Sequence, residues 1–215
     1  MPGPQATQVL SSTRAAISSL KGIEEDHGDL NDVEELPAAF AQVAKHLPAV
    51  CKALQSARLH IQKREDDNTW AEMKKPMDGC KAKADRLEGV YGKVVPSAPA
   101  QKMERYREAV SGLGKEGRVE VLMEAILRDV KGLLTVDGGM EAATESDLRE
   151  LADITAEVLA IPPSLQGDGS ALGIHNYGPG PQNVVTGDGH QYNNNNTGNQ
   201  FNGSTFHGVN PFSRE

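Results

Sequence analysis

The sequence predicts an all-α protein: a bundle of about five or six helices, followed by a disordered, amyloid-forming (cross-β) tail rich in Asn, Gly and Gln. Up to Pro163, apolar residues recur three and four positions apart, which is the period of an amphipathic helix. No segment there alternates apolar and polar residues as a strand would. From Ser164 the composition changes to Gly, Asn and Gln with few charges. We therefore divide the chain into residues 1–163 and residues 164–215.

The first helices are predicted over residues 8–23 and 36–61. The earlier pattern is weak, with Val9, Ile17 and Leu20 on one side. Pro37 suits the first turn of the second helix, where a missing N–H costs nothing, whereas Pro48 is expected to kink or break it. The second stripe is unbroken and alternates four and three residues apart: Leu36, Phe40, Val43, Leu47, Val50, Leu54, Ala57 and Ile61.

A third helix is predicted over residues 70–94. Thr69 and Glu72 have the spacing of a capping box at its start, and Pro76 is expected to disturb it as Pro48 disturbs the second. Its stripe is Trp70, Met73, Met77, Cys80, Ala84, Leu87, Tyr91 and Val94. The main core positions of the bundle are predicted to be Leu36, Phe40, Val43, Leu47, Leu54, Trp70, Met77 and Leu87.

Three shorter helices complete the predicted bundle, over residues 102–113, 118–134 and 145–160. The glycine-rich stretch from Gly112 to Arg118 resembles a phosphate-binding loop only faintly. It lacks a preceding strand, and no Ser or Thr follows Lys115, so we interpret it as a helix-helix connection. The apolar stripes are wide enough for one shared core.

Composition limits the partners and the compartment of the protein. The net charge of −8 argues against nucleic acid as a partner, because a nucleic-acid surface needs clustered Lys and Arg. The chain begins without the charged head and apolar run of a signal peptide, and no apolar run approaches the ~18 residues of a membrane span. We expect a cytoplasmic protein. Cys51 and Cys80 are then expected to be buried, reduced thiols, with a bridge between their helices left open.

No catalytic or metal-binding pattern is visible in the sequence. There is no His-Glu-x-x-His helix, no Gly-x-Ser-x-Gly turn and no Cys-x-x-Cys pair, and the six histidines keep no ligand spacing. We therefore expect no enzyme activity, no cofactor and no metal.

The tail contains a hidden nine-residue register, with its core at about residues 175–203. A Gly-x-Gln motif recurs three times, an aromatic residue follows the last two motifs, and the next residue is Asn in both. The register consists of Gly180, Gln182, Gly189, Gln191, Tyr192, Asn193, Gly198, Gln200, Phe201 and Asn202.

This register predicts self-assembly of the tail by cross-β stacking. In such a stack, Asn and Gln side chains form ladders along the fibril and aromatic rings stack on their own copies. Glycine permits the tight turns between short strands. The alternative is a soluble, passive extension, in which case the helical part is a non-catalytic adaptor or docking module.

Several segments of both parts carry a resemblance to known proteins. In the helical part they are LPAAFAQVAKHLP (36–48), MKKP (73–76) with CKAKA (80–84), and RYREAV (105–110) with LGK (113–115) and RVEVLM (118–123). Through these segments the helical part resembles the fungal SesA domain, found at the N-terminus of NACHT NTPases. Through residues 167–169, 175–183 and 186–193 the tail is similar to the σ prion-like motif of the same gene clusters.

The resemblance implies an effector of NOD-like-receptor signalling in heterokaryon incompatibility or regulated cell death. Its partners would be copies of itself and a NACHT-containing receptor whose matching σ motif templates the tail. In related effectors, assembly of the tail drives the helical domain to the plasma membrane. Residues 8–20 of this chain are too polar to span a bilayer, which leaves contact with the membrane surface.

Overall fold

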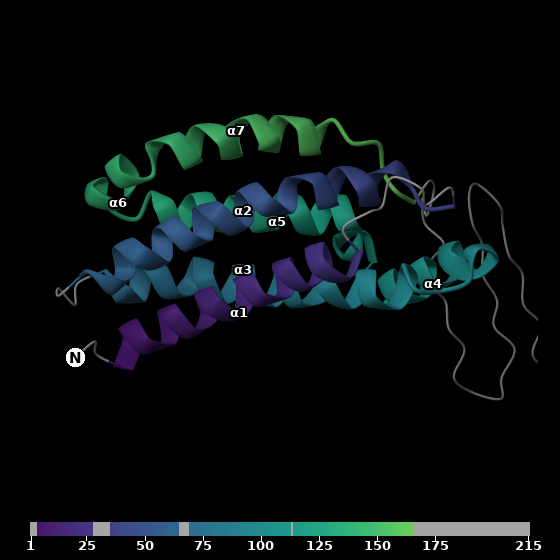
Figure 1. Cartoon of the computed structure of the whole chain (residues 1–215), viewed down its shortest axis with the longest axis horizontal. Helices are drawn as coiled ribbons and strands as arrows, with labels where there is room; N and C mark the ends of the chain where they lie inside the picture. Colours follow the sequence, from purple (N-terminus) through teal and green to yellow (C-terminus); the bar gives the residue numbers. More distant parts are fainter. Residues whose placement is uncertain (1–3, 28–34, 65–68, 113, 166–215) are drawn as a thin grey trace, which may run out of the picture. The chain divides into compact units, whose positions relative to one another are not determined.

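The computed structural model describes residues 4–27, 35–64, 69–112 and 114–165, and every regular element in these ranges is helical (Figure 1). The predicted all-α class is therefore confirmed for the described residues. The elements are α1 (Pro4–His27), α2 (Ala38–Gln62), α3 (Trp70–Val94), α4 (Pro99–Ser111), the 3-10 helix η2 (Gly114–Gly117), α5 (Val119–Leu134), α6 (Gly138–Ala143) and α7 (Glu145–Leu159).

Four of these helices form the bundle. α1 packs against α2 and α3, and α5 packs against the same two helices, so α1, α2, α5 and α3 enclose one core in that order. α1 and α3 run in one direction and α2 and α5 in the other (Figure 1). α4 packs on α3, while α7 (Glu145–Leu159) lies outside the four, against α2 and α5.

Seven of the eight predicted core positions are buried. The exception is Leu36, which is only partly buried and packs against the edge of the core. The predicted helix start at Leu36 is wrong, because Pro37 has an extended backbone (ψ 140°) and α2 begins at Ala38. The buried residues, each at most 3% exposed, are Phe40, Val43, Leu47, Leu54, Trp70, Met77 and Leu87.

The prediction that Pro48 and Pro76 break their helices and the prediction of a cap at Thr69 are also wrong. α2 and α3 continue as single helices through the two prolines, and the apolar neighbours Leu47 and Met77 are buried in the core. Thr69 precedes α3 but does not cap it: its backbone is helical (ψ 0°), not extended as a capping residue requires. Its hydroxyl is buried and has no hydrogen-bond partner among the described residues.

Polar groups in the core are few and mostly paired. The Tyr91 hydroxyl donates to the carbonyl oxygen of Phe40 at 2.7 Å, and the Phe40 ring lies 5.0 Å from the Tyr91 ring and 4.9 Å from the Tyr106 ring. Cys51 and Cys80 are buried and free. Burial raises the pKa of the Cys51 thiol to about 11 and that of Cys80 to about 12, so both stay protonated at neutral pH.

Candidate functional site

The candidate site is a contact between helices at the surface of the bundle. Within the ranges given above, no three His, Cys, Asp or Glu side chains lie together in a way that could hold a metal ion. In the same ranges, no helix is both long enough and apolar enough to cross a bilayer. The feature with a distinctive geometry is the segment from Asp137 to Leu165, which includes α6 and α7 and which we call the C-terminal arm.

The predicted assembly register lies outside the described residues. This applies to the whole predicted core at residues 175–203, and to Gly180, Gln182, Gly189, Gln191, Tyr192, Asn193, Gly198, Gln200, Phe201 and Asn202. The C-terminal arm is the part of the described chain that leads to this register.

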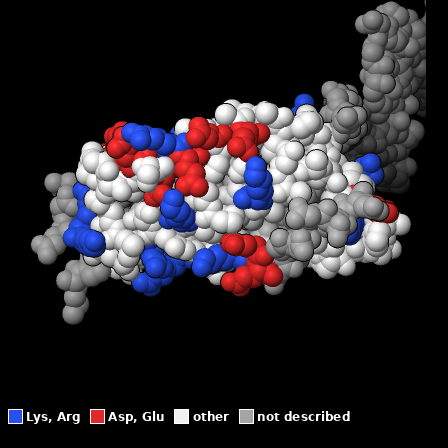
Figure 2. Space-filling model, turned by 45° about the horizontal axis from the view of Figure 1, so that its top comes forward, with Lys and Arg blue, Asp and Glu red and all other residues white. Residues whose placement is uncertain are grey.

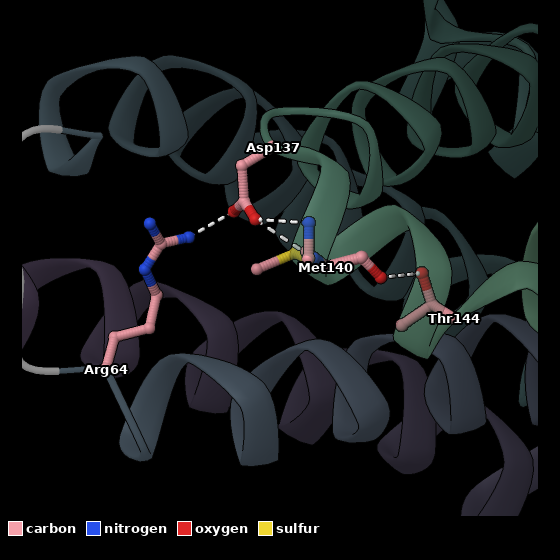
Figure 3. A network of polar contacts seen from close by, with 5 residues as sticks. Arg64, Asp137, Met140 and Thr144 are labelled. Carbon is pink, nitrogen blue, oxygen red and sulfur yellow. Dashed lines mark hydrogen bonds and ion pairs between the residues drawn. The ribbon is translucent and has the colours of Figure 1, made fainter.

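The arm begins with a capped helix that is attached to the end of α2. The Asp137 carboxylate accepts hydrogen bonds from the backbone N–H groups of Gly139 and Met140, both at 2.9 Å, and pairs with the Arg64 guanidinium (Figure 3). Burial alone would raise the pKa of Asp137, but these donors outweigh it and lower the pKa. The Thr144 hydroxyl donates to the Met140 carbonyl at 2.8 Å and links α6 to α7. This short helix was not predicted, because Gly138 and Gly139 disfavour a helix.

The middle of the arm is held by opposite charges on α2 and α7. α2 contains three Lys or Arg residues and no acidic residue, whereas α7 contains five acidic residues and a single Arg. Lys52 pairs with Glu150 at 2.9 Å and with Asp147 at 3.2 Å. The hydrogen bonds that the Lys52 ammonium donates to Glu150 and Asp147 raise the pKa of Lys52. The Asp147 side chain is 7% exposed and that of Glu150 is 45% exposed, so the Lys52–Asp147 contact is the more buried of the two. Figure 2 brings this face forward and shows Asp and Glu side chains gathered on it with Lys and Arg beside them.

A second set of polar contacts lies nearer the end of α7. Glu157 pairs with the Lys45 ammonium at 3.2 Å and with the His46 Nε2 at 3.3 Å. Burial lowers the pKa of His46 despite the nearby Glu157. A shallow pocket of about 290 Å³ opens here, lined by Gln42, Lys45, His46, Glu157 and Ala160.

The arm ends in a buried polar junction with α4 and α5. The Ser164 Oγ lies 2.6 Å from the Tyr106 hydroxyl, which also accepts a hydrogen bond from the backbone N–H of Val119 at 3.1 Å. The Ser164 backbone N–H donates to a carboxylate oxygen of Glu120 at 3.0 Å. Burial raises the pKa of Tyr106. Ser164 and Leu165 are both buried, so the packed chain continues two residues beyond Pro163, where the sequence placed the boundary.

The sequence pattern missed the face of α2 that receives the arm. Besides its main stripe and Cys51, α2 buries Ala39, His46 and Ala53, which are spaced seven apart and form a second row. Two alanines and a histidine carry little apolar signal. The only available indication was the absence of acidic residues from the whole of α2, next to the acidic residues of the helix predicted at 145–160.

Comparison with known proteins identifies one family. The model of SesA, described as the N-terminal domain on NACHT_NTPase and P-loop NTPases, matches residues 11–133. The match therefore runs from α1 to the last turn of α5, and the C-terminal arm follows it. No curated protein and no solved structure matches the chain.

Proposed function

The chain belongs to the SesA family, whose domain is described as the N-terminal domain on NACHT_NTPase and P-loop NTPases, and we propose that this protein is a non-catalytic effector of fungal NOD-like-receptor signalling. The helical bundle is the output domain. The segment after Leu165 receives the signal by joining a cross-β assembly that is seeded by a matching segment of a NACHT-containing receptor.

One observation carries this proposal: a SesA domain and a nine-residue Gly-x-Gln register occur in that order in one chain. The family match connects the first part to NACHT NTPases. The register supplies chemistry for templating, since identical Gln and Asn side chains bond best to copies of themselves in register. Gly189 and its equivalents allow the turns that such short repeats need.

The proposed output is heterokaryon incompatibility or regulated cell death. In this scheme the protein is cytoplasmic until its tail assembles, and assembly then concentrates the helical bundles at the plasma membrane. Many weak contacts with a membrane surface become strong when copies are linked in one assembly. A fluorescent fusion should therefore be diffuse in resting cells and form foci at the cell periphery after the receptor is activated.

The test is seeded assembly of the full chain. Purified protein should remain soluble during a lag and then form fibrils with the ~4.7 Å spacing of cross-β, and preformed fibrils should abolish the lag. Gln191→Lys should block seeding, because it places identical positive charges ~4.8 Å apart along the stack. In the unassembled chain the same lysine is expected to be solvated.

The matched control is Ser170→Ala, which lies outside the register and should seed normally. Both variants should unfold at the temperature of the unaltered protein, because neither residue belongs to the bundle. If the full chain stays monomeric at high concentration, the relay is wrong and the protein is a docking module with a passive tail. If both variants seed equally well, the nine-residue register has no structural role in the assembly.

A further inference from the structure

The four-helix bundle is complete without α7. α1, α2, α5 and α3 contact one another in a closed ring, and α7 packs against the outside of α2 and α5. In Figure 1, α7 lies along one side of the bundle and runs opposite to α2 and α5. The SesA match likewise ends in the last turn of α5. α7 is therefore an added helix that covers one face of an already closed bundle.

The apolar contact of α7 with this face is narrow. α7 buries four of its fifteen residues, of which Leu151, Ile154 and Val158 are apolar, and adds the partly buried Leu148, whereas α5 buries nine of sixteen. The opposite side of α7 is open to solvent, and Leu159 is 63% exposed. Because burial of apolar area is the main stabilising contribution to helix docking, α7 is held less strongly than the helices of the ring.

Opposite charges on α2 and α7 determine how α7 lies on the bundle. The face of α2 presents Lys45 and Lys52 with no acidic residue on the same helix, and α7 presents Asp147, Glu150 and Glu157 to them. The two lysine side chains are 69% and 60% exposed, so salt screens these contacts. The match of charges sets the antiparallel register of α7, since Lys45 meets the later carboxylate and Lys52 the earlier ones.

We propose that the α2–α5 face of the SesA bundle is a docking surface for an acidic amphipathic helix, and that α7 is its intramolecular, displaceable occupant. A partner helix that displaces α7 needs three apolar residues at the spacing of Leu151, Ile154 and Val158. It also needs carboxylates beside this apolar row, at the positions that Asp147 and Glu157 occupy here. This inference concerns the bundle and its arm, so it stands or falls independently of tail assembly.

The first test is hydrogen exchange on the full, unassembled chain. Backbone amides of α7 should exchange at least about tenfold faster than those of α2, α3 and α5, by local release rather than global unfolding. Raising the salt concentration should widen this difference, because the lysine–carboxylate contacts weaken. Amides of α7 that exchange at the same rate as those of α5, at every salt concentration, would overturn the proposal.

A charge reversal tests the register of the contact. Lys52→Glu places a carboxylate beside Asp147 and Glu150. The exchange rate of α7 amides should then rise about tenfold above that of the unaltered chain, while the exchange rate of α3 amides stays the same. Adding Glu150→Lys should restore most of the protection. Arg105→Glu makes the same charge change on α4 and should have no effect on α7. If Arg105→Glu and Lys52→Glu act equally, net charge rather than docking is responsible and the proposal fails.

The last test shows whether the vacated surface binds a helix in trans. In the full chain, Ile154→Asp should release α7 while leaving the α2–α5 face intact. A fluorescent peptide of residues 144–160 should bind this variant at least about tenfold more tightly than the unaltered chain, where α7 competes. Lys52→Glu in the same chain should weaken that binding. If the Ile154→Asp variant keeps its bundle helices but binds no peptide, the surface is not a docking site. Should that variant fail to fold, the hydrogen-exchange comparison decides alone.

Discussion

Replacing Tyr106 by Phe removes one oxygen atom at the place where α4, α5 and the end of the C-terminal arm meet. The backbone N–H of Val119, the first residue of α5, donates to this oxygen. An amide in the first turn of a helix has no acceptor within its own helix, so the substitution leaves it buried and unpaired. That costs roughly 1–3 kcal/mol, and losing the bond to Ser164 costs about 0.5–1.5 kcal/mol more. The free energy of unfolding should fall by about 2–4 kcal/mol.

Denaturant unfolding of the full chain, followed by far-UV circular dichroism, measures this loss. With a urea m-value of about 2 kcal/mol/M, the middle of the usual range, the midpoint should fall by about 1–2 M. The matched control is Tyr91→Phe, which removes a hydrogen bond to the carbonyl oxygen of Phe40, a group within α2. That change should cost only about 0.5–1.5 kcal/mol. The reasoning is refuted if Tyr106→Phe is no more destabilising than Tyr91→Phe.

Two further predictions concern the core. Leu87→Ala should lower the free energy of unfolding by about 2–5 kcal/mol, because Leu87 is fully buried; Leu159→Ala, at an exposed position, should stay within about 0.5 kcal/mol. Stability should also decline in alkaline solution. The folded-state pKa values of Cys51 and Cys80, about 11 and about 12, lie above the unperturbed value of 9.0, so the unfolded chain loses these protons first and ΔG of unfolding falls as pH rises above 9. A constant midpoint in urea from pH 7 to about 11 would contradict this.

The apolar period was sufficient to predict the bundle. Residues such as Val43, Leu47 and Leu54 carry a strong signal, because a side chain that must leave water on one side of a helix recurs every three or four positions. The same signal placed most of the predicted helices within a few residues of their observed bounds. It failed at Leu36 and Thr69, where the outcome depends on backbone conformation beside a helix end rather than on hydrophobic spacing.

The C-terminal arm was only half predictable. The helix at 145–160 could be read from its sequence, but its position could not, because its partners on α2 are small or polar. Ala39, His46 and Ala53 become a packing surface only when another helix covers them. Pairs such as Lys45 with Glu157 join residues more than a hundred positions apart. A charge carries no information about its partner until the register of two helices is fixed by packing.

The contacts of the arm differ along its length, and this difference identifies the part of α7 that opens most easily. Near the start of α7, Lys52 pairs with Asp147, whose carboxylate is 7% exposed. Beyond the end of α7, the chain is held again where Ser164 contacts Tyr106 and Glu120. Between these two attachments, Glu157 pairs with the exposed Lys45, and burial lowers the pKa of His46, so the imidazole is neutral at pH 7. An exposed pair contributes little and is weakened by salt. The last turn of α7 should therefore open before the first, and the amides nearest Leu159 should exchange before those nearest Leu151.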